Sequence, residues 1–342
     1  MKRTTVPAPV PSPAPLPSRA PVPSRALLSS LALVLGAATV LTACGQEGDG
    51  AAADKPGDGG RPTVCLVMKS LGNEYFQVMQ KGAEKHAKER GDLDLKTSGI
   101  QNETDIDGQV AAINKCVTQQ ADALVIAPAD SRALVAPLKR AEKQGLKVIN
   151  IDVKLDDGAL KSNDMKVPFV GPDNKAGARL SGDVLAKKLG KGASVVLLEG
   201  SPGADNARDR TAGFRASVKA GGLKLVDSKT AHWETDEAYN IVSNMLTSHP
   251  GIKGVLASND SMALGALKAI DAKKADVKVA SFDNIEAIRP YVQKGRVVAT
   301  VDQYAAKQAA DGIDQAMKAV KGDEPTGWVK TDVKVVTADD LG

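Results

Sequence analysis

The sequence predicts an α/β protein with two doubly wound lobes, each built on a parallel sheet. From Thr63 onward, short runs rich in Val, Ile and Leu alternate with amphipathic helical stretches. Continuous apolar strands that alternate with helices indicate parallel sheets covered on both faces. Roughly 280 residues follow Thr63, which is more than one compact core usually holds, so two lobes are expected.

The predicted strands are short and evenly spread along the chain. They lie at 63–68, 93–98, 123–128, 147–152, 166–171, 194–200, 223–228, 254–258, 277–283 and 296–302. Between them, apolar residues recur at spacings of three and four, and Gly often ends the stretch, which is typical of surface helices. Such helices are predicted at 75–90, 106–120, 132–145, 176–190 and 261–274.

Residues 1–43 are left out of the fold prediction because they have the order of a secretory signal peptide. Lys2 and Arg3 begin a proline-rich leader, and an apolar run at 26–43 precedes Cys44. The alternative is an uncleaved membrane helix, but serines interrupt the run, which is shorter than the roughly 20 residues a span needs. The segment "LTAC" at 41–44 resembles a bacterial lipobox. That resemblance implies cleavage before Cys44, lipidation of its thiol and an extracytoplasmic lipoprotein anchored to the cell membrane.

The chain from Cys44 onward is predicted to begin with a tether and to carry no net charge. The whole chain has a formal net charge of +4, and residues 1–43 hold four basic and no acidic residues, so the remainder is neutral. A basic surface is therefore not expected, and neither is a nucleic acid partner. Residues 44–62 are rich in Gly, Ala and Asp and lack apolar periodicity, which predicts a flexible, lipid-anchored tether.

Two further cysteines lie within the predicted lobes. Cys65 is in the first predicted strand, and Cys116 is in the helix between the second and third strands. A right-handed crossover would lay that helix against the sheet near the first strand. Because an exported protein permits oxidation, a disulfide and a pair of buried thiols both remain open.

No metal and no cofactor are expected. His86, His232 and His249 have no ligand spacing. The motifs G-x-S-x-G, G-x-x-x-x-G-K-[ST] and G-x-G-x-x-G are missing from the sequence, so the corresponding hydrolase, phosphate and dinucleotide sites are not predicted.

Polar side chains follow many of the predicted strands, at the edge where ligands bind in open α/β sheets. Each of them has a second explanation, because Asx and Ser residues also cap helices. Tyr75 and Phe76 lie side by side at the same edge, in a chain that is only 3% aromatic. Carboxylates and amides bind hydroxyl groups, and flat rings cover the apolar face of a sugar. The combination predicts a site for a neutral polyhydroxylated ligand.

Four segments carry a resemblance to a known family. They are "LGNEYFQVMQKGA" (71–83), "ARDRTAGF" (207–214), "NMLTSHPGIKGVLASNDSMALGALKA" (244–269) and "VASFDN" (279–284). From 63 to 340 the chain resembles the ribose-binding-protein branch of the type I periplasmic binding proteins, which are the sugar-capturing subunits of ABC importers. The resemblance implies two Rossmann-like lobes joined by a three-strand hinge.

The resemblance also implies which residues bind the ligand. Asn73 would bind hydroxyls, Tyr75 and Phe76 would form one wall of a stacking sandwich, and Trp233 would supply the opposing ring. The polar contacts implied are Asp152, Arg210, Asn259, Asp283 and Gln303. From the residues alone, Arg210 could equally be a surface helix charge, and Trp233 a ring capping the core.

Two positions depart from the ribose-binding pattern. Val153 stands where that branch has an arginine, and Ala127 stands where it has an asparagine. A site that lacks these donors would leave ribose hydroxyls unpaired, so the identity of the sugar is open. Lys69 or Lys154 would be the replacement donor, or the ligand would present a deoxy or methyl edge there.

The resemblance implies lobe boundaries and a mode of action. Lobe one would comprise 63–172 and 304–332, and lobe two 173–303 and 333–340. Closure about the hinge would trap the sugar or polyol, and a membrane permease would recognise the closed form. A monomer is expected. The alternatives are a signal or sensor receptor of the same fold and, from a different class, a glycosidase that uses paired carboxylates.

Overall fold

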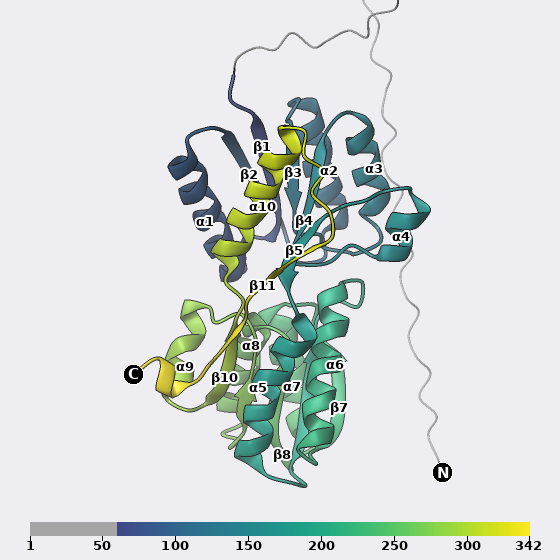
Figure 1. The fold of residues 1–342 in the computed structure, drawn as a ribbon. Helices are drawn as coiled ribbons and strands as arrows, with labels where there is room; N and C mark the ends of the chain where they lie inside the picture. The colour runs from purple at the N-terminus through teal and green to yellow at the C-terminus, as the bar shows by residue number, and fades with distance from the viewer. Residues whose placement is uncertain (1–59) are drawn as a thin grey trace, which may run out of the picture. The chain divides into compact units, whose positions relative to one another are not determined.

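The structure, a computed structural model, describes residues 60–342 (Figure 1). The predicted signal peptide, Cys44 and most of the predicted tether lie outside the described residues. Among the residues that are described, no helix combines the length and the apolar character needed to cross a membrane.

The first lobe is a six-stranded sheet in the order β11-β5-β4-β3-β1-β2, with every neighbouring pair parallel. Its strands are β1 (Thr63–Ser70), β2 (Asp94–Ile100), β3 (Ala123–Ile126), β4 (Lys147–Ile151), β5 (Phe169–Pro172) and β11 (Trp328–Thr331). Its helices are α1 (Glu74–Arg90), α2 (Ile106–Thr118), α3 (Val135–Lys143), α4 (Asp157–Ser162) and α10 (Ala305–Val320).

The second lobe repeats this plan with the order β12-β10-β9-β8-β6-β7. Its strands are β6 (Ser194–Glu199), β7 (Lys224–Thr230), β8 (Ile252–Ala257), β9 (Lys278–Ala280), β10 (Val297–Asp302) and β12 (Lys334–Val336). Its helices are α5 (Asn174–Leu189), α6 (Asp205–Ala220), α7 (Thr235–Ser248), α8 (Asp260–Ala272) and α9 (Arg289–Gln293), with short 3₁₀ turns η1 (Glu286–Ile288) and η2 (Ala338–Asp340). The predicted fold class is confirmed.

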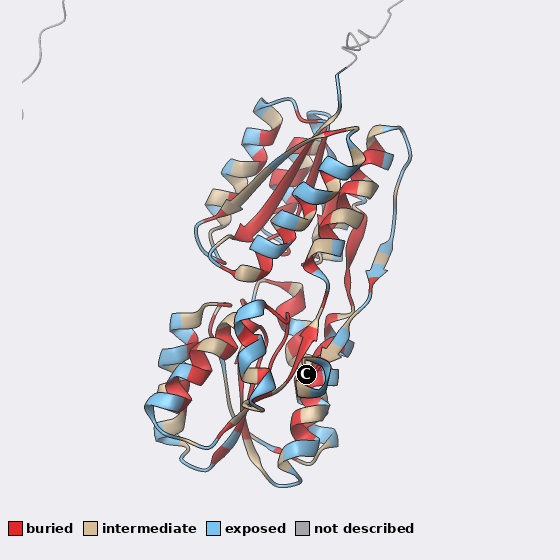
Figure 2. Ribbon diagram, turned by 90° about the vertical axis from the view of Figure 1, so that its left-hand side faces the viewer, coloured by how far each residue is buried: buried red, intermediate tan, exposed pale blue. Residues whose placement is uncertain are grey.

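Sheet and helices follow from the apolar pattern of the sequence. Strands such as β3, with four buried residues in succession, lie between helices on both faces, and Figure 2 shows the buried strands between helices that are exposed on their outer sides. Several helices begin at side-chain caps, as at Asn73, Asp105 and Asp173, whose oxygens accept hydrogen bonds from backbone N–H groups of the first turn.

Two details differ from the expected parallel strands. β12 pairs with β10 in the antiparallel direction. The chain passes from β11 to β12 through only two residues, so it enters the second sheet from the edge that faces the first lobe and runs against its neighbour. The strand predicted at 277–283 is regular only from Lys278 to Ala280. Beyond it, the Ser281 and Asp283 N–H groups still donate to the Ala299 and Val301 carbonyls, but the φ angle of 120° at Asp283 lies outside the range of strands.

Three chain segments connect the two sheets. They are the step from β5 into α5 at Asp173, the step from β10 into α10 at Gln303 and Tyr304, and the β11–β12 link at 332–333. Trp328 braces one of these segments, since its indole nitrogen donates to the Gly171 carbonyl at 2.8 Å.

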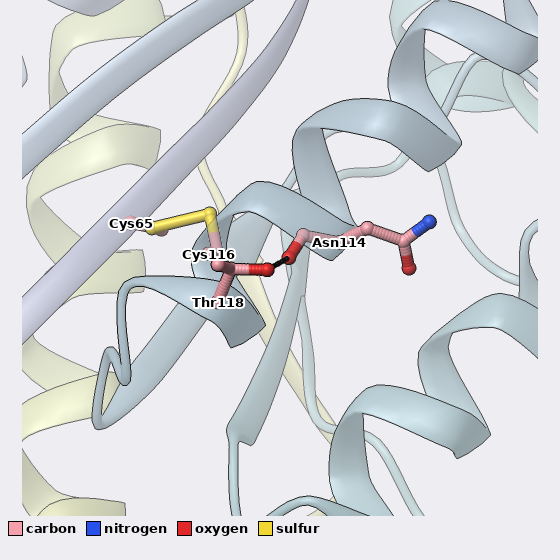
Figure 3. Close-up of a disulfide and its surroundings, with 4 residues drawn as sticks. All are labelled: Cys65, Asn114, Cys116 and Thr118. Carbon is pink, nitrogen blue, oxygen red and sulfur yellow. Dashed lines mark hydrogen bonds between the residues drawn. A yellow bond between two sulfur atoms is a disulfide. The ribbon is translucent and has the colours of Figure 1, made fainter. Parts of the chain in front are cut away.

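Cys65 of β1 and Cys116 of α2 form a disulfide, with Cα atoms 6.2 Å apart (Figure 3). Both residues are buried in the core between the sheet and helices α2 and α3. The bond therefore ties α2 to β1, the strand next to the edge of the first sheet.

Candidate ligand-binding site

A closed cavity lies between the lobes, where the carboxyl ends of the strands of both sheets meet. It holds about 240 Å³ of empty space. All nine residues predicted to bind the ligand line it: Asn73, Tyr75, Phe76, Asp152, Arg210, Trp233, Asn259, Asp283 and Gln303. Lys69, Glu103 and Asn206 complete the lining.

The wall from the first lobe is built on the start of α1. Asn73 caps this helix by accepting from the Tyr75 N–H at 3.0 Å, and its amide nitrogen donates to Glu103 Oε1 at 3.0 Å. The cap places Tyr75 and Phe76 in the first turn, with their rings edge to face and the centroids 5.1 Å apart. Because the rings are nearly perpendicular, at most one of them can lie flat against a ligand.

A buried ion pair forms the next part of this wall. Lys69 Nζ lies 2.6 Å from Glu103 Oε2, and both side chains are almost fully buried. The ammonium group also lies 5.1 Å from the Trp233 ring centroid and 5.7 Å from that of Phe76. Burial raises the pKa of Glu103, and Lys69 opposes that rise. The pair places a fixed ammonium donor beside the rings.

Asp152 follows β4 and points its carboxylate into the cavity. Its backbone is in the left-handed region, with φ at 64°, which costs a non-glycine residue about 1 kcal/mol or more. The Tyr75 hydroxyl donates to Asp152 Oδ1 at 3.3 Å. Burial raises the pKa of Asp152, while the positive charges of Lys69 and Arg210 lower it.

The wall from the second lobe is organised by Arg210 of α6. Its guanidinium donates to Asn174 Oδ1 at 2.8 Å, to the Ser258 carbonyl at 2.9 Å and to Asp283 Oδ1 at 3.4 Å. It also lies over the Phe282 ring, 3.7 Å from the centroid. These contacts fix the guanidinium inside the lobe, so Arg210 is not a surface helix charge; Arg208 is the partly exposed arginine of this helix.

Trp233 follows β7 with a left-handed backbone, φ 72°, and is buried. Its ring lies against the backbone of Gly200, where an added Cβ would overlap the indole. The ring also lies near both cationic side chains of the cavity, Lys69 and Arg210. Its indole nitrogen has no hydrogen-bond partner among the described residues.

Three side chains at strand ends complete the second wall. Asn259 caps α8 by accepting from the Met262 N–H at 2.9 Å. Asp283 follows β9, and Gln303 follows β10 and donates to Asp283 Oδ1 at 2.7 Å. Burial raises the pKa of Asp283 well above its usual range, the Arg210 charge opposes this rise, and nearby carboxylates add to it.

The structure adds three lining residues to the predicted set and corrects one alternative. Lys154 pairs with Asp157 at 2.5 Å and does not line the cavity, whereas Lys69 does. Glu103 lies in a loop without a strand or helix pattern, so its sequence context gave no signal. Asn206 precedes the "ARDR" segment, and its amide oxygen accepts no hydrogen bond from the part of the chain that is described.

Val153 and Ala127, the two departures from the ribose-binding pattern, are fully buried and do not line the cavity. The described residues contain no group of three or more His, Cys, Asp or Glu side chains that could hold a metal ion. What the cavity offers is a ring of hydrogen-bonding groups with two aromatic surfaces, which suits a small hydroxylated molecule.

Comparison with known proteins agrees with this geometry. Residues 64–324 match the model of the periplasmic binding protein domain. The chain belongs to the periplasmic binding protein family. This periplasmic binding protein is 46% identical over 285 residues to the D-ribose/D-allose-binding protein of Pseudomonas aeruginosa, a match that covers 81% of this chain and 89% of that protein.

Two crystal structures of solute-binding proteins from ABC transporters share the fold. One, from Burkholderia multivorans, is 47% identical with a TM-score of 0.79, and covers 81% of this chain and all of that chain. The other, from Actinobacillus succinogenes with bound D-allose, is 35% identical with a TM-score of 0.77, and covers 82% and 99%. The two-lobed fold of this periplasmic binding protein is therefore that of the sugar-binding members of its family.

Proposed function

We propose that this periplasmic binding protein captures one neutral sugar or polyol between its lobes and delivers it to the permease of an ABC importer. The observation that carries the proposal is the closed cavity itself, in which amides, carboxylates, a guanidinium and an ammonium group converge with the rings of Phe76 and Trp233. Two relatives support it: one is a D-ribose/D-allose-binding protein, and the other is the solute-binding protein of an ABC transporter with bound D-allose.

The charges of the cavity favour a neutral ligand. Lys69 is paired with Glu103, and Arg210 contacts Asp283. An anionic ligand would have to displace Glu103 or Asp283 from its cation, and a buried carboxylate left unpaired is costly. Hydroxyl groups, in contrast, donate to carboxylates and accept from the cations without disturbing either pair.

D-ribose and D-allose are the first ligands to test, since a relative with 46% identity is named for them. We assign Asn73, Asp152, Arg210, Asn259, Asp283 and Gln303 to hydroxyl binding and Phe76 and Trp233 to ring contacts. Lys69 is the donor that replaces the arginine missing at Val153, and the unpartnered Asn206 amide oxygen accepts from a further hydroxyl.

Ligand binding would be coupled to closure, because the lobes contact each other directly around the cavity. The Ser131 N–H donates to the Gly203 carbonyl at 3.0 Å, and the Asp205 N–H donates to Ser131 Oγ at 2.9 Å. On the other side, Glu103 N–H donates to Glu234 Oε1 at 3.1 Å. These contacts exist only when the lobes are closed, so a ligand held by both lobes would stabilise the closed form.

No catalytic step is part of the proposal. Each carboxylate in the cavity accepts a hydrogen bond from the protein on one oxygen, Asp152 from Tyr75, Asp283 from Gln303 and Glu103 from Asn73, and we assign the cavity carboxylates a binding role only. The protein would act as a monomer on the outer side of the cell membrane, with Cys44 carrying the lipid anchor and residues 44–62 acting as the tether. Lobe one would comprise 63–172 and 304–332, and lobe two 173–303 and 333–340.

The deciding experiment is a thermal-shift screen of D-ribose, D-allose, other pentoses and hexoses, and myo-inositol, followed by titration calorimetry. A ligand that binds only the native state raises the melting temperature by mass action. If no sugar or polyol raises the melting temperature, the proposal is wrong.

A separate experiment tests the anchor. Cys44→Ala should release the protein from the membrane fraction without changing sugar affinity, and retention would contradict lipidation at Cys44.

A further inference from the structure

Asp260, the first residue of α8, is a fully buried carboxylate that does not line the cavity. Its oxygens accept hydrogen bonds from three groups outside its own helix. Oδ1 accepts from Ser281 Oγ and from Thr300 Oγ1, the latter at 2.9 Å, and Oδ2 accepts from the Ile285 N–H at 3.0 Å. The helix start is thereby joined to the β9–η1 loop and to β10.

Two of these contacts lie two residues before and two residues after Asp283, which lines the cavity. Between Ser281 and Ile285 the backbone adopts φ values of 120° at Asp283 and 56° at Asn284. Non-glycine residues hold such angles only where the surroundings impose them. Thr300 adds to the hold, since its hydroxyl accepts from the Asn284 N–H at 3.2 Å while donating to Asp260.

We propose that Asp260 is a positioning residue that holds the 281–285 loop in this conformation, and so aims the Asp283 carboxylate into the cavity without touching the ligand. The effect on affinity rests on the proposed function, whereas the effect on the loop does not. Through this loop, a residue behind the cavity wall sets how well the protein binds its sugar.

A second role for Asp260 must be separated from this one. A negative charge in the first turn of α8 also interacts favourably with the helix dipole. Asp260→Asn tests both, because it removes the negative charge and replaces one of the two acceptor oxygens with a donor N–H₂ group. If the carboxylate served only the helix, the substitution would leave the loop and Asp283 unaffected.

The first measurement is hydrogen–deuterium exchange of the ligand-free protein. In Asp260→Asn we expect the amides of 281–285 to exchange at least about tenfold faster than in wild type, because the loop loses one of the two carboxylate oxygens that hold it through Ser281, Thr300 and the Ile285 N–H. Ser217→Ala is the matched control: Ser217 is buried in the same lobe, and its hydroxyl donates to the Arg179 carbonyl at 3.0 Å between α6 and α5. That variant should leave the exchange of the loop unchanged.

The second measurement is a double-mutant cycle on D-allose or D-ribose affinity, using whichever sugar the wild type binds. Asp260→Asn alone should weaken binding about tenfold, but less than about twofold in an Asp283→Ala background, because its effect passes through Asp283. Equal losses in both backgrounds, or unchanged loop exchange, would overturn the inference. If wild type binds no sugar, the proposed function fails, and the exchange experiment still decides the role of Asp260.

If Asp260→Asn does not fold, the same two measurements can be made on milder variants. Ser281→Ala and Thr300→Val each delete one hydrogen bond to Asp260 and leave the carboxylate in place. Each should raise loop exchange and lower affinity about threefold, and unchanged values in both would contradict the inference.

Discussion

The side-chain nitrogen of Gln308 lies 3.1 Å from the Tyr75 hydroxyl, and the same nitrogen lies 2.8 Å from the Gln303 carbonyl oxygen. It also lies 3.3 Å from Oε1 of the Gln303 side-chain amide. Tyr75 donates to Asp152, and the same Gln303 amide donates to Asp283, so a chain of hydrogen bonds joins the two carboxylates of opposite lobes. Gln308 is fully buried and does not line the cavity. Gln308 therefore links the ligand-binding residues of the two lobes without itself lining the cavity.

We expect Gln308→Met to weaken sugar binding about five- to tenfold, because it removes both donations while keeping a side chain of similar length. Burial raises the pKa of Tyr75 well above its usual range, so its phenol stays neutral and donates to Asp152. In the variant, the phenol oxygen loses the hydrogen bond that Gln308 donates. Calorimetry gives the affinity. Gln80→Met, at a half-buried position of α1 outside the cavity, is the control, and equal affinities for both variants would refute the connection.

Glu74 holds the lobes together outside the cavity. Its carboxylate, at the start of α1, accepts from the backbone N–H groups of Glu286 at 2.6 Å and Ala287 at 3.3 Å in the second lobe. Glu74→Ala should weaken sugar binding by about 0.5–1.5 kcal/mol without altering a ligand contact, because the closed form loses these bonds. Small-angle scattering should then show a larger radius of gyration at subsaturating sugar. Unchanged affinity and radius would show that the contact does not favour closure.

Trp233 and Trp328 are the two tryptophans of the chain, which allows a clean optical test. Trp328 is about half exposed on β11, and Trp233 is buried in the cavity. In a Trp328→Phe variant, sugar should still change the fluorescence, because the remaining indole lies at the ligand. Trp233→Ala should lose at least about 1.5 kcal/mol of affinity through the missing ring face. A full fluorescence response in Trp233→Phe would place the ligand elsewhere.

Much of the site could be predicted from the sequence because its residues follow strand ends, and the ends of parallel strands meet at one edge. Asn73, Asp152 and Asn259 were predictable in this way. The positive φ angles of Asp152, Trp233 and Asp283 were not, because tertiary packing imposes them against the local preference of the chain.

Residues that act from loops or from behind the wall escaped prediction. Glu103 lies in a loop whose position depends on the contact of its backbone with Glu234 of the other lobe. Gln308 lies in a helix that crosses back from the second lobe, so only the folded chain brings it next to Tyr75. Such contacts join residues more than 100 positions apart, and no local pattern encodes them.

Buried carboxylates give the ligand-free protein an unusual dependence on pH. Burial raises the pKa of Asp152 and Asp283, and it raises that of Asp260 to about 7. The folded protein therefore binds more protons than the unfolded chain between about pH 4 and about pH 7, so stability falls as the pH rises through this window. We expect a higher melting temperature at about pH 5 than at about pH 7.

Sugar affinity should change in the opposite direction. A protonated Asp283 no longer accepts two hydroxyl hydrogen bonds, so acidification should weaken binding at a higher pH than an ordinary aspartate would allow. Asp283→Asn should reduce the pH dependence of both sugar affinity and melting temperature, although Asp152 and Asp260 still contribute to the latter. Asp340→Asn should leave both profiles unchanged between about pH 5 and about pH 7, since Lys334 lowers the pKa of Asp340 to about 2. A melting temperature that falls from about pH 7 to about pH 5 would contradict this account.

The disulfide should stabilise the first lobe without contributing to the site. Cys65 and Cys116 are separated by 51 positions, and closing a loop of that length stabilises a fold by about 4 kcal/mol in the chain-entropy estimate. Replacing both with Ala should therefore lower the free energy of unfolding by about 2–4 kcal/mol, measured by urea denaturation. Sugar affinity should remain unchanged, because neither residue lines the cavity. Equal stability of the variant and the oxidised protein would mean that packing alone holds α2 against β1.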